Sequence, residues 1–267
     1  MRQSFFGRLS VCVRGATVCA GLLWLGTATA YGPQGHLIAG RAAAGFLCRA
    51  AVAEVGRLGG GDGLDELGLW ADRVRGTAAF RHTGPWHYMN IADGASLAAY
   101  VSPAEGDILT ALDRAYGQLR PGSAATRTER EQALRFLIHM LVDLHQPLHV
   151  GRAEDRGGNR IDVRVAGDRL NLHRLWDTEA ITTGAQDVVS YARSIGDNIG
   201  PGLLDEPFDP RVWAAESLEL RAAVYGFPGD GAALSSAYME QSRAITRDRL
   251  TLAAGRLAAT LNGLFCR

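Results

Sequence analysis

The 267-residue chain is predicted to fold as an all-α protein: a mainly α-helical single domain with one small β-hairpin. Apolar residues recur at helical spacing along most of the sequence, whereas only residues 157–172 alternate in the way strands do. Alternating strand and helix units, repeats, low-complexity tracts and linkers are all absent from the sequence. The composition, 47% hydrophobic and 21% charged, is that of an ordinary globular protein and excludes a disordered or fibrous chain.

The first thirty residues indicate a secretory signal peptide. Arginines precede an apolar run at 16–25, and Ala28-Thr29-Ala30 places small residues at positions −3 and −1 of a cleavage site. A membrane anchor is the alternative, but the run is too short to span a bilayer comfortably. We therefore expect cleavage near Ala30–Tyr31 and an exported domain, 31–267, that is periplasmic or secreted and has no stable membrane insertion.

The first two helices are expected at 37–58 and 64–75, separated by a glycine-rich loop at 59–63. Residues 80–95 look irregular. The next helical pattern, 103–119, stops at Pro121-Gly122.

A further helix is expected to begin at Thr128, since Glu131 three residues later completes a capping box, and to end near His145, before Gln146-Pro147. The segment 157–172 then predicts the hairpin, with its turn at Gly167-Asp168. Helical patterns return at 173–197, 211–224 and 234–263.

The cysteines and the charge balance agree with export. Once residues 1–30 are removed, Cys48 and Cys266 remain, and a pair in an oxidising compartment suggests one disulfide. Two unpaired buried thiols are the alternative. The domain after cleavage carries 25 basic and 28 acidic residues, and no basic patch points to nucleic acid.

Two His–Asp pairs carry the strongest chemical signal. His139 and Asp143 are four residues apart within an apolar helix, and His173 and Asp177 repeat the spacing. Because burying such groups is costly unless they are satisfied, each pair is either a hydrogen-bonded pair within a core or part of a metal site. Five histidines and three aspartates in such contexts favour zinc: His36, His87, His139, His149, His173, Asp72, Asp143 and Asp177.

The expected new N-terminus adds a ninth group. A free α-amine on Tyr31 and the carbonyl oxygen of the same residue can close a five-membered chelate, which His36 could complete. An uncleaved precursor could not form this chelate, so activity would depend on export.

From Tyr31 to Asp177 the sequence resembles the zinc-dependent single-strand-specific nucleases of the S1/P1 type, which share a fold with bacterial zinc phospholipase C. The resemblance rests on G-x-x-G-H, W-A-D-R-V-R, W-H-Y, H-M-L-V-D-L-H-Q-P-L-H, D-R-G-G-N and N-L-H-R-L-W-D in this order. It implies three zinc ions: one held by Asp72, His87, His139 and Asp143; a second by Tyr31 and His36, with Asp143 bridging; and a third by His149, His173 and Asp177.

The resemblance also assigns roles around the metals. Arg75 matches an arginine that stabilises charge on the phosphate, and Tyr88 matches an aromatic residue that stacks on a base. Tyr31 stands where the family usually has Trp, and Asn90 stands where an Asp that contacts the base edge is expected. Arg75 could instead be a surface ion-pair partner, and Tyr88 a packed aromatic.

Three polar residues near these motifs are not expected to bind metal. His145 is expected to support the site from outside the ligand set, and His82 to be exposed to solvent. Asn159 is expected either to support the site in the same way or to be a turn residue before the hairpin.

The resulting hypothesis is a secreted phosphodiesterase in which a zinc-bound hydroxide attacks in line. With Asp143 and Arg75 in catalytic roles, it would cleave single-stranded RNA and DNA to 5′-phosphorylated products, and could also act on 3′-nucleotides. No protein partner is implied. The alternatives are a zinc-dependent phospholipase C, a non-catalytic zinc protein and a core without metal.

Overall fold

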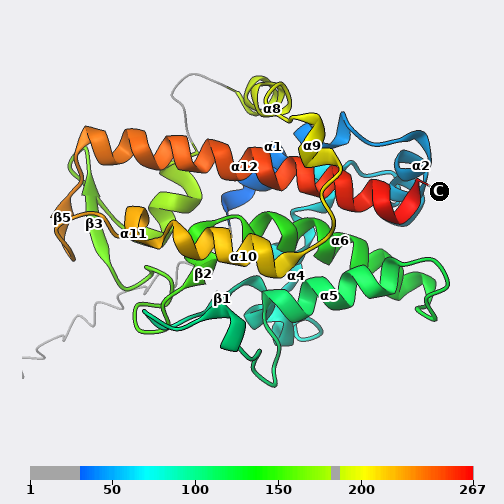
Figure 1. Ribbon diagram of the computed structural model, residues 1–267, viewed down its shortest axis with the longest axis horizontal. Coiled ribbons are helices and arrows are strands. Elements are labelled where there is room, and N and C mark those ends of the chain that lie inside the picture. The colour runs from blue at the N-terminus through cyan, green and yellow to red at the C-terminus, as the bar shows by residue number, and fades with distance from the viewer. Residues whose placement is uncertain (1–30, 182–186, 267) are drawn as a thin grey trace, which may run out of the picture.

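The computed structural model describes residues 31–181 and 187–266, so the expected signal peptide lies outside the described residues. The helices are α1 (Gly32–Ala44), α2 (Arg49–Gly59), α3 (Leu64–Leu67), α4 (Trp70–Val74), α5 (Ile108–Leu119), α6 (Arg127–Leu144), α7 (Leu172–Arg174), α8 (Val188–Gly196), α9 (Pro201–Leu204), α10 (Pro210–Glu219), α11 (Arg221–Val224) and α12 (Ser236–Phe265). Shorter turns are the 3₁₀ segments η1 (Arg81–His87), η2 (Leu97–Ala99) and η3 (Pro147–His149), and the π-helical η4 (Leu175–Glu179). The predicted mainly α-helical class is confirmed (Figure 1).

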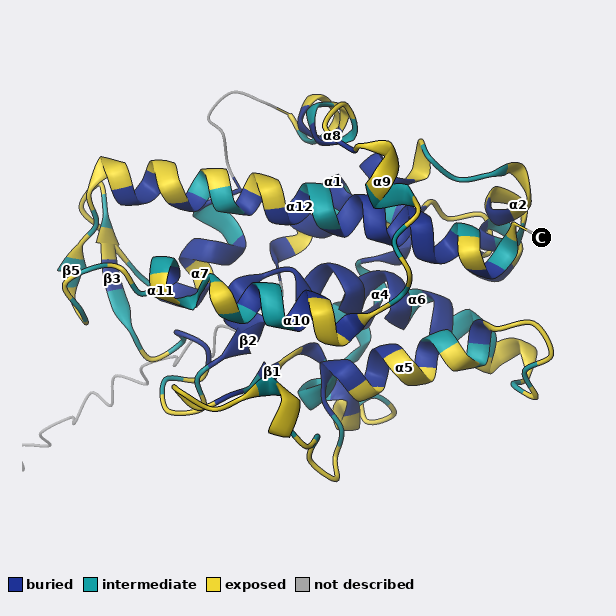
Figure 2. Cartoon of the chain, in the orientation of Figure 1, coloured by how far each residue is buried: buried dark blue, intermediate teal, exposed yellow. Residues whose placement is uncertain are grey.

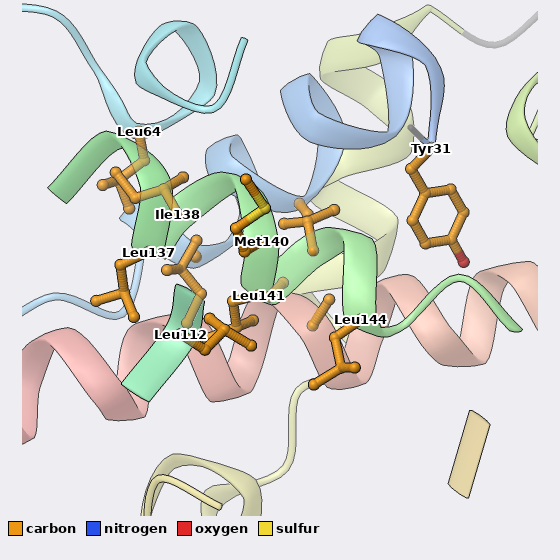
Figure 3. Packing of buried hydrophobic residues seen from close by; sticks show 14 of the residues in the cluster. Tyr31, Leu64, Leu112, Leu137, Ile138, Met140, Leu141 and Leu144 are labelled. Carbon is orange, nitrogen blue, oxygen red and sulfur yellow. The ribbon is translucent and has the colours of Figure 1, made fainter. Parts of the chain in front are cut away.

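Helix α6 lies at the centre of the fold. Every residue from Phe136 to Leu144 is buried, and seven of these nine residues are apolar (Figure 2). It packs against α5, α2, α12 and α10. Figure 3 shows side chains of α6, among them Leu141, beside Leu112 of α5 and Leu64 of α3.

The start of α6 differs from the expectation by two residues. The capping box is formed by Thr126 and Glu129: the Thr126 hydroxyl accepts from the Glu129 amide, and the Glu129 carboxylate accepts from the Thr126 amide at 2.8 Å. Thr128 and Glu131 have the same spacing but lie inside the helix. Glu131 pairs with Arg127 instead, at 2.8 Å.

The end of α6 is held by side chains from other helices. Ser217 of α10 donates to the Leu144 carbonyl at 2.7 Å, and Arg249 of α12 donates to the His145 carbonyl at 3.1 Å. These carbonyls have no partner within the helix, so the bonds satisfy groups that would otherwise be buried alone. Arg249 and Arg256 both bind Glu216, at 2.8 Å and 2.6 Å, which joins α12 to α10.

The expected helix at 37–58 is two helices. Helix α1 ends at Ala44. Cys48 then caps α2, since its sulfur accepts a hydrogen bond from the Ala51 amide. Cys48 forms the expected disulfide with Cys266, which ends α12. In Figure 1 the C-terminus accordingly lies beside α2, and Asn262 braces the junction by accepting from the Cys48 amide.

Other expected helices are also shorter or divided. The segment 64–75 holds α3 and α4, 211–224 holds α10 and α11, and 173–197 holds α7, η4 and α8 with residues 182–186 outside the described part. The helix expected from 103 begins only at Ile108, where Asp107 and Thr110 form a capping box. The divided segments have the apolar spacing of helices, but turns interrupt the helices within them.

The strands are β1 (Met89–Asn90), β2 (Val150–Gly151), β3 (Asp162–Val165), β4 (Asp168–Asn171) and β5 (Ala232–Ala233). The predicted hairpin is β3–β4, and β5 adds a parallel strand beside β3. The parallel β1–β2 pair places Met89 opposite Val150 and so brings the residues after His87 next to those after His149. Within the described residues, no helix is long and apolar enough to cross a membrane.

The disulfide closes a loop with a sequence separation of 218 residues. Replacing both Cys48 and Cys266 with Ser is expected to lower the free energy of unfolding by about 3 to 5 kcal/mol, because the unfolded chain gains the entropy that the long loop had removed. Urea unfolding of the variant measures this difference, with reduced wild-type protein as the control that should show the same loss. A decrease below about 1 kcal/mol would contradict a stabilising role.

Candidate metal centre

The structure brings the side chains of the eight His and Asp candidates together from separate elements. Helix α1 supplies His36, α4 supplies Asp72, η1 supplies His87, and η3 supplies His149. Helix α6 supplies His139 and Asp143, while α7 and η4 supply His173 and Asp177. All are buried except Asp72, whose side chain is 16% exposed.

Their ligand atoms form three groups: His36, His139 and Asp143; Asp72, His87 and His139; and His149, His173 and Asp177. Within each group, the atoms lie within 4.8 Å of one another. The i, i+4 spacing on α6 places His139 on the same face as Asp143, one turn away, which is why His139 belongs to two groups. The third group contains the same residues as the third set that the family resemblance implies, whereas the first two groups share His139 rather than Asp143.

Asp143 lies between the first two groups. One carboxylate oxygen is 3.2 Å from His36 Nε2, and the other is 3.1 Å from His87 Nδ1 and 3.0 Å from His139 Nε2. The rings of His36 and His139 stack with centroids 4.0 Å apart. Three imidazoles therefore converge on a single fully buried carboxylate, which can be shared by two cations.

Backbone carbonyls set the orientation of three histidines. The Nδ1–H groups of His139, His149 and His173 donate to the carbonyls of Gly68 at 2.6 Å, His87 at 2.7 Å and Gly157 at 2.6 Å. A ring that donates through Nδ1 keeps the lone pair on Nε2 available to a metal.

Several buried atoms of the candidate ligands have no hydrogen-bond partner, among them Nε2 of His36 and of His149 and one oxygen each of Asp72 and Asp143. Leaving so many buried polar atoms unsatisfied is costly, and divalent cations would satisfy them together. Imidazole nitrogens and carboxylate oxygens are a donor set suited to first-row transition metals. The residues therefore fit a metal centre.

Burial shifts the pKa values of two candidate ligands in the third group. Burial, reinforced by His173, lowers the pKa of His149 to about 3, and burial raises the pKa of Asp177 to about 7. The folded chain alone thus disfavours the charged forms of both groups. A bound cation reverses the balance for the carboxylate by favouring its ionised form.

Gln146 binds one of the candidate ligands, and the sequence patterns do not single it out. Its amide donates to Asp177 at 2.7 Å, and its carbonyl oxygen accepts from the Leu148 amide. The side chain thereby fixes the orientation of a candidate ligand. In the sequence, Gln146 is distinguished only by its position between His145 and Pro147, and this position indicates a helix end.

Tyr31 lies at the start of α1 and is buried at 1% exposure. Its carbonyl accepts from the Gly35 amide at 3.1 Å. Gly32 follows with φ +45° and lies so close to the Asp177 carbonyl that a β-carbon would stand 2.7 Å from that oxygen. The beginning of α1 is therefore packed against the third group while the same helix carries His36 to Asp143.

A cleft of about 560 Å³ opens beside the groups and is lined by His87, His149 and His173 together with Arg75, Tyr88, Asn90, Arg156 and Asn159. Arg75 lies 3.3 Å from Asp72, and the Tyr88 side chain is 43% exposed. Cationic, aromatic and amide groups thus surround the entrance to the candidate ligands.

The remaining polar residues lie around the site rather than within the groups. His145 donates to the Leu141 carbonyl and faces Arg256 at 3.0 Å, so it connects α6 to α12. Asn159 donates to the Arg156 carbonyl at 2.9 Å and thereby braces its loop. His82 is exposed, as expected, and its ring meets Trp86 edge-on.

Comparison with known proteins identifies the family. A family model described as S1/P1 Nuclease matches residues 31–266. The chain is 30% identical to Endonuclease 1 of Arabidopsis thaliana over 235 residues, which cover 76% of this chain and 75% of that protein. It is 26% identical to Nuclease S1 of Aspergillus oryzae, covering 74% and 78%, and 31% identical to Nuclease P1 of Penicillium citrinum, covering 52% and 54%.

The match extends beyond the motifs, which end at Asp177, to nearly the whole described chain, and it includes every residue of the three groups. The chain belongs to the S1/P1 nuclease family.

Proposed function

We propose that this chain is a zinc-dependent nuclease that hydrolyses single-stranded RNA and DNA to 5′-phosphorylated products and also acts on 3′-nucleotides. The observation that carries the proposal is the convergence of three buried His/Asp groups beside a cleft lined by Arg75 and Tyr88, in a chain of this family. The phospholipase alternative is not retained, because the curated relatives that match are nucleases and endonucleases.

Three zinc ions would be distributed over nine ligating residues. Asp72, His87, His139 and Asp143 would hold the first, His149, His173 and Asp177 the third, and Tyr31 with His36 the second, which would share Asp143 with the first. When bound, zinc makes water a nucleophile near neutral pH and polarises phosphoryl oxygens. The unsatisfied buried nitrogens and oxygens described above support this distribution.

The residues of the chain would bind and orient the substrate. The Arg75 guanidinium, held beside Asp72, is placed to stabilise charge that develops on the phosphate. The exposed Tyr88 ring offers a stacking surface that tolerates any base, and Asn90 offers an amide to the base edge. Gln146 keeps Asp177 oriented.

We also propose that the protein is exported and acts after its leader has been removed. The basic and apolar pattern of residues 1–30 and the disulfide between Cys48 and Cys266 support an oxidising compartment. The proposed partners are a single-stranded nucleic acid or a nucleotide, and no protein partner is implied.

Protein that begins at Tyr31 is expected to contain three zinc ions per chain and to cleave single-stranded RNA and DNA. A chelator should abolish cleavage, and the products should carry 5′-phosphates because the 3′-oxygen is the leaving group. Elemental analysis and end-labelling of the products measure both properties. Intact nucleic acid from fully zinc-loaded protein would overturn the proposal, and phosphatidylcholine would be the next substrate to test.

Asp143→Ala is expected to lose at least one zinc ion and to reduce kcat about a hundred-fold or more, since the shared carboxylate is removed. Arg75→Ala is its matched control: zinc content should stay at three while kcat falls about a hundred-fold through lost charge stabilisation. Three zinc ions and full turnover in Asp143→Ala would refute the shared role. Loss of metal from Arg75→Ala would make that residue a structural support.

A chain extended by Gly-Ser before Tyr31 is expected to lose one of the three zinc ions and at least about ten-fold in activity, because an acylated amine cannot coordinate metal. Tyr31→Phe with the correct N-terminus should retain all three ions, since only backbone atoms of this residue would bind. Zinc analysis of the extended protein decides the question. Three ions bound there would exclude the α-amine as a ligand.

A further inference from the structure

Arg156 has a backbone conformation that L-residues rarely adopt. Its φ is +57°, and among the described residues other than glycine only Tyr31 and Ala166 also have positive φ. Such a conformation is unfavourable for a residue with a β-carbon. Gly157 and Gly158, which follow, have φ +61° and +81°, so glycine would suit position 156 as well. A strained arginine at the mouth of a cleft therefore calls for a functional explanation.

Hydrogen bonds tie the loop that carries Arg156 to the candidate ligands. The Arg156 carbonyl accepts from the Asn159 amide side chain at 2.9 Å, and Asp155 accepts from the Gly158 amide at 2.7 Å. The next carbonyl, that of Gly157, accepts from His173 at 2.6 Å. The position of the arginine is thus fixed relative to the third group of ligands.

The Arg156 guanidinium is available for a ligand. The residue is exposed and lines the cleft, and the guanidinium makes no hydrogen bond or ion pair with any residue the structure describes. Its neighbours are engaged: Arg152 binds Asp93 at 2.9 Å, and Arg160 binds the Glu154 carbonyl at 3.0 Å. Arg75, in the same cleft, lies against Asp72.

We propose that Arg156 binds a second phosphate of the polynucleotide, next to the phosphate that reacts. This inference rests on the proposed nuclease function and deepens it. A planar guanidinium binds phosphate oxygens in pairs, and an unpartnered one at a cleft mouth suits the backbone of a chain that continues past the cleft. The reacting phosphate already has Arg75 and the metal groups, so Arg156 distinguishes chains from substrates with a single phosphate.

The test compares a dinucleotide, which has one phosphodiester and no further phosphate, with a tetranucleotide of the same base. Arg156→Gln and Arg156→Gly are expected to reduce kcat/KM for the tetranucleotide about ten-fold, with a loss at least five-fold smaller for the dinucleotide. The plot of log KM against log salt for the tetranucleotide should become shallower by about 0.7, as one phosphate contact is lost. Arg156→Lys should restore part of the difference.

Stability separates binding from a structural role. Arg156→Gly removes the β-carbon at a positive φ, so its Tm is expected to equal or exceed that of the wild type while activity on the tetranucleotide falls. Ala166→Gly is the matched control: it makes the same backbone change in the hairpin turn, φ +51°, and should leave both activities unchanged.

Equal losses on both substrates, an unchanged salt slope, or a Tm lowered in proportion to activity would each overturn the proposal. If the wild-type protein cleaves both substrates and the Arg156 variants keep its ratio of kcat/KM for the tetranucleotide to kcat/KM for the dinucleotide, this inference alone is overturned. Wild-type protein that cleaves neither substrate overturns the proposed function and this inference with it.

Discussion

The burial of the Asp143 carboxylate is the constraint on which the rest of the structure depends. An ionised group in the fully buried last turns of a helix is tolerated only if other groups compensate for its charge. Here His36, His87 and His139 surround it, and each comes from a different element. The apolar packing of α6 is thus inseparable from the chemistry of the site, because the helix that forms the core also carries the central ligand.

The C-terminal end of α6 meets a second network of charges. Glu216 holds Arg249 and Arg256, and although burial raises its pKa, the two guanidiniums lower it overall. Burial and both arginines hold the pKa of His145 well below its usual range, so this ring stays neutral and can accept a hydrogen bond from Arg256. Side chains of α10 and α12 thus hold the end of the helix from which Asp143 presents its carboxylate.

Sequence spacing predicted the two His–Asp pairs of the candidate site, because the i, i+4 spacing of residues such as His139 and Asp143 shows their common face directly, and the family resemblance supplied the other candidates. It could not predict the groups that orient them: the carbonyl partners belong to residues of any type, and Gln146 acts through a tertiary contact. The divided helices were missed because apolar spacing continues across turns such as the one before Cys48. The sequence did not indicate the left-handed backbone of Arg156, because the two glycines that follow it were enough to explain a turn.

The disulfide between Cys48 and Cys266 has a consequence for damage by proteases. Because the bridge encloses almost the whole domain, a single nick at any exposed bond between the two cysteines leaves both fragments covalently joined. The pieces separate only after reduction. The bridge turns a cut that would release a fragment into one that the packed helices can hold together.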